Sequence, residues 1–173
     1  MDLKFTASTF EFLCCRVTTA GASIITLTIY RLGSQSICVA FFDELTKLLE
    51  RLATYRTPVI LTGDINIHFE RAEDADACRI TEIFTSFGLQ QFVDLPSHER
   101  GGILDVIVAP CDEPPTDVVV EDVGLSDHML VSWTVNLTPP LPVYVTTTRR
   151  SWKTFKKENF FRSTVVIRTG HPG

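Results

Sequence analysis

The sequence predicts an α/β (α+β) domain in which two helices pack on a mixed, mostly antiparallel sheet. Three observations support this class. The apolar run 59–67 is typical of a strand that is buried on both faces. Residues 23–30 alternate between apolar and polar with the period of a half-buried strand. Residues 36–53 and 77–87 carry apolar side chains at helical spacing.

The predicted elements follow one another along most of the chain. The strand 23–30 forms a hairpin with the preceding strand 10–17, because a short turn with Gly21 separates them. The first helix ends before Pro58, and the second ends at Gly88, where a residue without a side chain commonly stops a helix. The remaining expected strands are 59–67, 89–93, 103–109, 118–123 and 129–135.

Length and charge predict one domain followed by a different kind of segment. With 173 residues, of which 45% are hydrophobic, the chain can build one sizeable core. Residues 1–143 carry 9 Lys/Arg and 20 Asp/Glu, whereas residues 144–173 carry 7 and 1. We therefore expect a domain over 1–143 and a basic tail over 144–173, with a short helix over 149–162. An acidic domain does not attract nucleic acid over long range, although a bound divalent cation inverts the charge locally.

Cysteine usage and the absence of long apolar runs point to an intracellular protein. The five cysteines are odd in number and show no CxxC spacing, which fits free thiols in a reducing compartment. No run approaches the roughly 18 apolar residues that cross a bilayer. The first residues also lack the apolar region of a secretory signal. We expect a nuclear or cytoplasmic protein that is not secreted and has no membrane partner.

Polar residues interrupt three apolar segments near the ends of expected strands. Asp64 and Asn66 follow one strand, Asp105 lies inside the next apolar run, and Asp127 and His128 directly precede 129–135. These residue types suffice for metal-assisted attack on a phosphodiester. Carboxylate oxygens bind Mg²⁺, a His or Asp deprotonates water, and an amide side chain holds a phosphoryl oxygen.

Simpler interpretations exist for some of these residues. Asp64 and Asn66 also fit a turn whose side chains bond their own backbone, and 126–128 fits a turn that enters a strand. Asp105 is harder to explain alone, because an unpaired carboxylate is costly to bury. His128 is the partner that we expect, since a carboxylate that accepts from the ring fixes its tautomer and raises its basicity.

Four short motifs then occur in a fixed order. They are Tyr30-Arg31, Gly63-Asp64-Ile65-Asn66, Leu104-Asp105 and Ser126-Asp127-His128. In this order and at these separations they resemble the endonuclease/exonuclease/phosphatase superfamily. Residues 96–105 are similar to the Thr-His-x-x-Gly-x-Thr-Leu-Asp signature of the endonuclease domain of non-LTR (LINE-type) retrotransposons. The basic tail resembles the linker that leads to a reverse transcriptase domain.

The resemblance implies a fold and a chemistry. The fold is the DNase I-like four-layer α/β sandwich, of which this chain would form the C-terminal portion. The implied activity is Mg²⁺- or Mn²⁺-dependent hydrolysis of phosphodiester bonds, which nicks DNA.

The resemblance also implies roles for the catalytic residues. Tyr30 would orient the scissile phosphate, and Asn66 would stabilise the phosphoryl oxygens. Asp64 would position or deprotonate the attacking water or assist the leaving group. His128 would act as a base or phosphate contact, oriented by Asp105.

Further residues match positions near the family's site. Asp127 would sit beside the metal ion. Ser97, His98 and Arg31 would contact the substrate.

The chain departs from the family pattern in its first part. The family domain has two similar halves, and the first half supplies an early Asn and the metal-binding Glu. Glu11 and Glu44 are the only early glutamates, and neither lies in a matching context. We therefore expect the N-terminal part of the domain to be missing and Mg²⁺ binding to be weak, because Asp127 alone offers few oxygens. Leu32 and Ile103 also replace the family's usual Pro and Thr.

These departures leave three functions open. The chain is an endonuclease that nicks DNA, a catalytically inactive remnant or ion-binding interaction module, or a phosphatase or phosphodiesterase of the same fold. The expected partners are DNA as substrate and a reverse transcriptase domain outside this sequence. The aromatic and basic residues of the tail fit either contact with single-stranded nucleic acid or a linker that packs on another domain.

Overall fold

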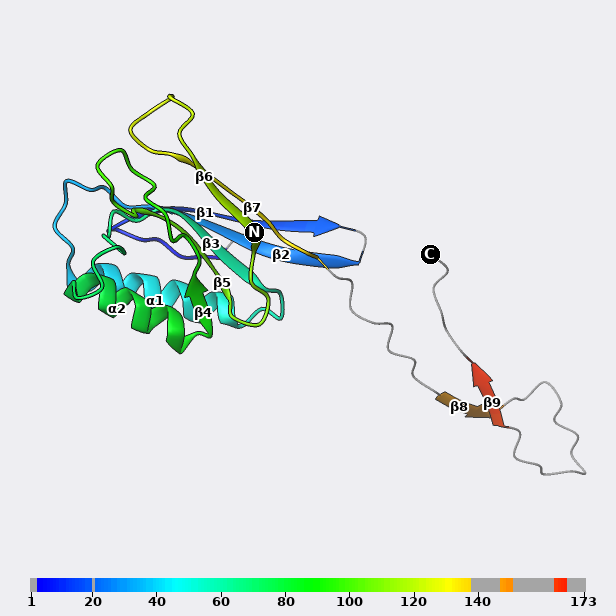
Figure 1. Ribbon diagram of the computed structural model, residues 1–173. Helices are drawn as coiled ribbons and strands as arrows, with labels where there is room; N and C mark the ends of the chain where they lie inside the picture. Colours follow the sequence, from blue (N-terminus) through cyan, green and yellow to red (C-terminus); the bar gives the residue numbers. More distant parts are fainter. Residues whose placement is uncertain (1–2, 20, 138–146, 151–163, 168–173) are drawn as a thin grey trace, which may run out of the picture. The chain divides into compact units, whose positions relative to one another are not determined.

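The computed structural model describes residues 3–19, 21–137, 147–150 and 164–167. Contacts between Cα atoms divide the chain into two units, Met1–Thr138 and Pro139–Gly173. The first unit contains β1 (Glu11–Thr19), β2 (Ala22–Tyr30), α1 (Val39–Ala53), β3 (Val59–Asp64), α2 (Ala75–Ser86), β4 (Leu89–Gln91), β5 (Asp105–Pro110), β6 (Thr116–Glu121) and β7 (Leu130–Thr134) (Figure 1). The second contains β8 (Thr147–Arg150) and β9 (Thr164–Ile167), which pair in an antiparallel fashion.

The main sheet of the first unit is mixed. Its strand order is β1-β2-β3-β5-β4, in which β2 and β3 are parallel and the other neighbours are antiparallel. β6 and β7 form a separate antiparallel pair. The predicted class is confirmed, because a mixed, mostly antiparallel sheet is accompanied by two helices within the described residues.

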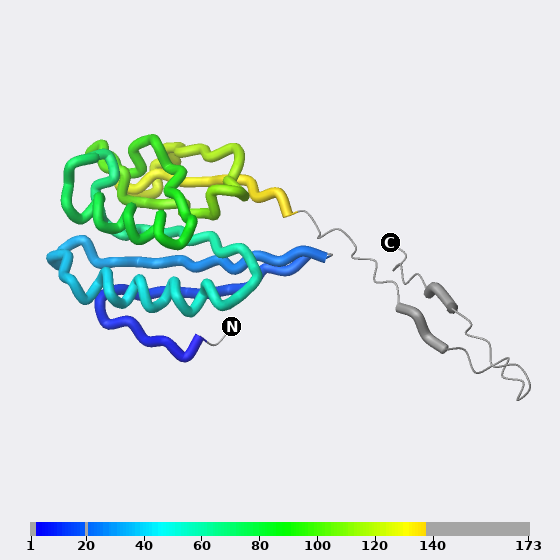
Figure 2. The backbone as a smooth tube through the Cα atoms, turned by 90° about the horizontal axis from the view of Figure 1, so that it is seen from below, coloured from blue at the N-terminus to red at the C-terminus, as the bar shows by residue number. Residues whose placement is uncertain are grey.

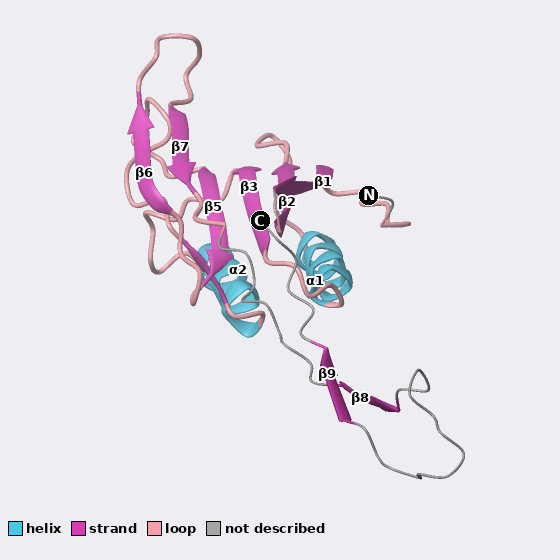
Figure 3. Ribbon diagram, turned by 90° about the vertical axis from the view of Figure 1, so that its right-hand side faces the viewer, coloured by secondary structure: helices cyan, strands magenta, loops and turns pink. Residues whose placement is uncertain are grey.

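Both helices cover the same face of the five-stranded sheet (Figures 1 and 2). The apolar stripe predicted for the first helix is buried there; its residues are Phe41, Phe42, Leu45, Leu48, Leu49 and Leu52. The β6–β7 pair lies on the opposite face (Figure 3), where Val131 and Trp133 pack against a buried cluster that includes Ile60 and Ile107. The part of this face formed by β1 and β2 is more open, so Leu13 is 65% exposed.

The cysteines are free, as the sequence predicts. Cys14 is buried in the core, and Cys15, Cys38, Cys78 and Cys111 are exposed. Within the described part of the chain, no helix combines the length and the apolar character that crossing a membrane requires.

The prediction of a helix over 149–162 is wrong for its first two residues. Arg149 and Arg150 belong to β8, where they pair with Val165 and Thr164. The β-branched residues on both sides of this pair favour extended backbone, and cross-strand pairing outweighs the weak helical pattern. Residues 151–162 lie outside the described residues.

Glu44 fastens the N-terminal segment to α1. Its carboxylate accepts hydrogen bonds from the backbone N–H and the hydroxyl of both Ser8 and Thr9, at 2.6 to 3.0 Å. This early glutamate is therefore occupied by a structural contact.

We expect Glu44 to make stability depend on acid pH. Burial opposes its ionisation, but the hydrogen bonds from Ser8 and Thr9 outweigh burial and lower the pKa of Glu44 to about 2 from 4.5. Because the folded-state pKa is the lower one, this stabilisation is present above pH 4.5 and is lost as the pH falls toward 2. Glu44→Gln should lower the free energy of unfolding at pH 7 by about 1–2 kcal/mol.

Urea denaturation of wild type and Glu44→Gln between pH 2 and pH 7 measures this effect. The exposed Glu50 on the same helix supplies the control Glu50→Gln. A pH profile for Glu44→Gln that parallels that of wild type would contradict the prediction.

Candidate active site

One end of the sheet brings polar side chains from three strands into a row. In the strand register, Tyr30 of β2 lies opposite Asp64 of β3, and Asp64 lies opposite Asp105 of β5. Paired residues point to the same face of a sheet, so the three side chains share one face. Side-chain exposure is 16% for Asp64 and 21% for Asp105, whereas Tyr30 is 46% exposed.

Gly63 allows β2 and β3 to approach closely just before Asp64. Its φ is +122°, and a Cβ at this position would lie 2.0 Å from the carbonyl oxygen of Ile29. Only glycine fits both the backbone conformation and the space. The position of Asp64 therefore depends on the residue before it.

Asp64 and Asn66 form the turn that the simpler interpretation predicts. Asp64 Oδ1 accepts the backbone N–H of Asn66 at 3.0 Å, and Asp64 Oδ2 accepts from Asn66 Nδ2 at 2.8 Å. Asn66 Nδ2 also donates to the carbonyl oxygen of Arg31 at 2.9 Å. Both amide hydrogens of Asn66 thus have acceptors. In this arrangement Asn66 orients Asp64, and a phosphoryl oxygen would have to displace one of these acceptors.

Arg31 is buried beneath this turn, with 3% of its surface exposed. Its guanidinium donates to the carbonyl oxygens of Ile65 (2.7 Å), Asn66 (2.7 Å), Gln35 (2.8 Å) and Leu32 (3.2 Å). Burial lowers the pKa of Arg31, although the charge of Asp64 opposes this effect. The contact of Arg31 with substrate stays a prediction, and in this structure its guanidinium bonds only to backbone carbonyl groups among the described residues. A buried guanidinium needs acceptors, and the loops after β2 and β3 supply them.

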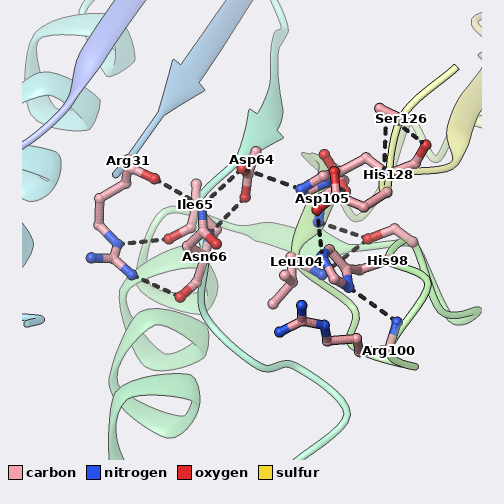
Figure 4. Close-up of polar contacts among 12 residues, drawn as sticks. Arg31, Asp64, Ile65, Asn66, His98, Arg100, Leu104, Asp105, Ser126 and His128 are labelled. Atoms are coloured by element: carbon pink, nitrogen blue, oxygen red, sulfur yellow. Dashed lines mark hydrogen bonds and ion pairs between the residues drawn. The ribbon is translucent and has the colours of Figure 1, made fainter. Parts of the chain in front are cut away.

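His128 lies between the two carboxylates of the row (Figure 4). Its Nδ1 is 2.8 Å from Asp105 Oδ2, so the predicted contact is present, and its Nε2 is 3.9 Å from Asp64 Oδ2. Because a carboxylate accepts at Nδ1, the neutral ring carries its proton there and leaves Nε2 free to take up another. Burial alone would lower the pKa of His128, but the hydrogen bond and charge of Asp105 and the charges of Asp64 and Asp127 raise it overall.

The surroundings of Asp64 disfavour its ionised form. Burial and the negative charge of Asp105 raise its pKa, and hydrogen bonds from Asn66 together with the charge of His128 offset only part of this effect. Two partly buried carboxylates that face one another favour a cation or a proton between them.

The segment before β7 is joined to the loop that precedes β5. Ser126 Oγ accepts from the backbone N–H of His128 and lies 3.1 Å from the carbonyl oxygen of His128, so the strand-entry turn is also present. His98 Nε2 is 3.3 Å from Asp127 Oδ2, and the rings of His98 and His128 meet edge to face at 4.9 Å. His98 Nδ1 accepts the backbone N–H of Arg100 at 3.1 Å, so the proton of the neutral ring resides on Nε2.

Two groups of side chains have the spacing of metal ligands. Their ligand atoms lie within 4.8 Å of one another; the groups are Asp64, Asp105 and His128, and His98, Asp127 and His128. The first group supplies two carboxylates, which suit Mg²⁺. The second supplies one carboxylate and two imidazoles, a set that suits transition metals, and the His98 nitrogen that faces Asp127 carries a proton. The pair Asp64 and Asp105 therefore fits a magnesium ion better than Asp127, whose side chain is 59% exposed.

Sequence reasoning did not single out Glu70. Its Oε2 accepts the backbone N–H of Ile103 at 2.8 Å, and its Oε1 lies 2.6 Å from His68 Nδ1. Burial opposes ionisation, but these hydrogen bonds lower the pKa of Glu70. Glu70 thereby holds the loop after β3 against the segment that leads into Asp105. An acidic residue in an irregular acidic stretch gives no sequence signal of this contact.

Comparison with known proteins finds likeness at the level of fold. No protein-family profile and no curated protein matches the sequence. The endonuclease domain of TRAS1, a telomere-specific non-LTR retrotransposon, matches with a TM-score of 0.62 and 18% identity over 73% of this chain and 62% of that chain. The 3′ phosphatase NExo from Neisseria, solved with a product DNA hairpin, matches with a TM-score of 0.52 and 15% identity over 71% and 64%.

A third solved structure is an endonuclease/exonuclease/phosphatase family protein from Leptotrichia buccalis, with a TM-score of 0.47 and 14% identity over 77% of this chain and 62% of that chain. The chain spans less than two thirds of each of these three proteins. At such identities the likeness is one of fold, and the likeness to the TRAS1 endonuclease domain confirms the fold that the ordered motifs predict.

Proposed function

We propose that this chain, which has the DNase I-like fold of the endonuclease and phosphatase structures that it matches, hydrolyses phosphodiester bonds in DNA. The observation that carries the proposal is the array of His128 with Asp105 on one side and Asp64 on the other. It pairs a base in a fixed tautomer with a second carboxylate at the end of the sheet. Such an array can activate water and stabilise the charge that develops on the ring.

The proposed reaction is a hydrolytic displacement at phosphorus. His128 Nε2 takes a proton from the attacking water while the water oxygen bonds to phosphorus. One phosphorus–oxygen bond breaks, and the leaving oxygen takes up a proton. Asp105 stabilises the imidazolium through the 2.8 Å hydrogen bond, and Asp64, whose Oδ2 is 3.9 Å from His128 Nε2, would position the water. Tyr30 borders the same row and would orient the phosphate.

Mg²⁺ or Mn²⁺, when bound, would polarise a phosphoryl oxygen and offset negative charge. Asp64 and Asp105 would supply carboxylate oxygens to it. One Asp105 oxygen is already held by His128, and both Asp64 oxygens accept from Asn66. We therefore propose that these residues alone bind the ion weakly.

The wider context of the proposal follows the same resemblance. Residues 1–143 would correspond to the C-terminal portion of a retrotransposon-type endonuclease domain, and 144–173 to the linker toward a reverse transcriptase. The tail carries 7 Lys/Arg against 1 Asp/Glu, so it would supply positive charge for contacts with DNA phosphates outside the scissile position. Free cysteines fit a nuclear or cytoplasmic location.

Nicking of supercoiled plasmid tests the proposal. The full chain is incubated with plasmid and Mg²⁺ or Mn²⁺, and conversion to relaxed circles is measured on gels. Nicking should occur with either ion and stop when EDTA is added. Absence of nicking with both ions, for a chain shown to be folded by circular dichroism, would favour the catalytically inactive interaction module.

The second candidate is a phosphatase of the same fold, because the likeness extends to a 3′ phosphatase. Release of inorganic phosphate from a 3′-phosphorylated oligonucleotide distinguishes the two. Nicking without phosphate release supports the endonuclease, and phosphate release without nicking supports the phosphatase.

A further inference from the structure

Ser97, which was expected to contact substrate, is fully buried. It is 0% exposed, although it lies in a polar loop. Its hydroxyl oxygen accepts the backbone N–H of Leu104 at 3.0 Å and that of Asp105 at 2.9 Å. A buried hydroxyl that accepts two amides fixes the backbone at the residue where β5 begins. DNA cannot reach this oxygen unless the loop opens.

The backbone of the same residue holds the segment that carries His128. The carbonyl oxygen of Ser97 accepts the N–H of Met129 at 2.8 Å. One residue further, His98 and His128 form an antiparallel β-bridge, and the N–H of Glu99 donates to the carbonyl oxygen of Asp127 at 2.9 Å. Ser97 is thus bonded to Asp105 on one side and to the neighbour of His128 on the other.

This placement links two segments that are distant in sequence. Asp105 and His128 are 23 residues apart, and their side chains meet at 2.8 Å. The carboxylate holds the imidazole tautomer only while this distance is kept, because a hydrogen bond weakens steeply when its length or angle changes. The bonds of Ser97 fix the backbone on both sides of the contact.

We propose that Ser97 is a positioning residue that sets the Asp105–His128 contact and so keeps the proton of the neutral His128 ring on Nδ1. This inference rests on the proposed function in assigning His128 as the base. Ser97 acts through Asp105 and His128 and touches no substrate. Removing the hydroxyl leaves two buried amide hydrogens without an acceptor, and the start of β5 must shift to recover one.

The first test observes the ring without requiring activity. The ¹⁵N chemical shifts of His128 are measured in the histidine-labelled full chain at a pH at which the neutral ring predominates. Wild type and Ser97→Thr, which keeps the hydroxyl, should show the proton on Nδ1. Ser97→Ala should show a mixture of the two tautomers. An unchanged Nδ1–H tautomer in folded Ser97→Ala would overturn the proposal.

The second test measures nicking by the same proteins. We expect Ser97→Ala to lower kcat by about 10- to 100-fold with little change in KM, and Ser97→Thr to restore most of the rate. Ser86→Ala removes a hydroxyl that bonds only within α2 and should match wild type. A KM that rises while kcat is unchanged would overturn the proposal and instead favour direct substrate contact.

Two outcomes separate this inference from the proposed function. If wild type does not nick DNA but its tautomer responds to Ser97→Ala, the positioning role stands and the endonuclease proposal fails. If Ser97→Ala does not fold, Ser97→Cys serves instead, because sulfur keeps the approximate size but accepts hydrogen bonds weakly. An unchanged tautomer and rate in Ser97→Cys would then overturn the inference.

Discussion

His128→Ala is expected to lower the nicking rate of the chain by about 10²- to 10⁴-fold, the contribution typical of a positioned general base. The Asp105 carboxylate holds Nδ1 of the His128 ring, which leaves Nε2, 3.9 Å from Asp64, to take a proton from water. Alanine also leaves Asp105 without its hydrogen-bond donor. The measurement is the initial rate of plasmid nicking at saturating Mg²⁺.

His68→Ala is the matched control. His68 is paired with Glu70 at 2.6 Å and belongs to neither group of side chains with metal-ligand spacing. Its substitution should leave the rate within about threefold of wild type, because the hydrogen bond from Ile103 to Glu70, which holds the segment before Asp105, does not involve His68. Equal losses for His128→Ala and His68→Ala would show that the reduction reflects general destabilisation.

Asp64→Asn is expected to reduce nicking by about 10²-fold or more without destabilising the fold. The substitution removes a negative charge that burial and Asp105 disfavour, as the raised pKa of Asp64 indicates. A raised folded-state pKa means that the ionised carboxylate opposes folding at neutral pH, and that this cost disappears as the pH falls below the unfolded pKa. The amide keeps the size of the side chain, and its one oxygen can still accept one of the two hydrogen bonds that Asn66 donates.

Thermal unfolding at pH 7 supplies the second measurement for this variant. We expect the Tm of Asp64→Asn to lie between that of wild type and a value about 3 °C higher. A shift of about 3 °C corresponds to roughly 1 kcal/mol in a domain of this size. The exposed Asp112 provides the control Asp112→Asn, which should change neither rate nor Tm. A clearly lower Tm for Asp64→Asn would mean that its hydrogen bonds with Asn66 outweigh the repulsion.

Much of the fold was predictable because short-range patterns determine it. The alternation over 23–30 marks β2, and the helical stripe from Phe41 to Leu52 marks the buried side of α1. These elements bury one face each, so their periodicity records their surroundings. The tail was not predictable in this way, because the pairing of β8 with β9 depends on residues that are distant in sequence.

The candidate site was predictable only where a charged residue interrupted an apolar segment of the sequence. Asp105 interrupts an apolar run, and the cost of burying its charge pointed to His128. Arg31 gave no such signal, since the carbonyl groups that surround it come from two separate loops. Backbone acceptors leave no trace in the side-chain sequence. For the same reason the bonds that Ser97 makes with backbone amides could not be read from its neighbours.

The open face of β1 and β2 has a consequence for how the polypeptide behaves in concentrated solution. Leu13 and Val17 are exposed on β1, the outer strand of the sheet within the described residues, and an outer strand can hydrogen-bond to another chain. Self-association through this surface would bring a second copy of the chain close to Tyr30, because Tyr30 lies at the end of β2. The second copy would then compete with DNA for access to this side chain. If the proposed activity is present, self-association at high protein concentration would therefore lower the nicking rate.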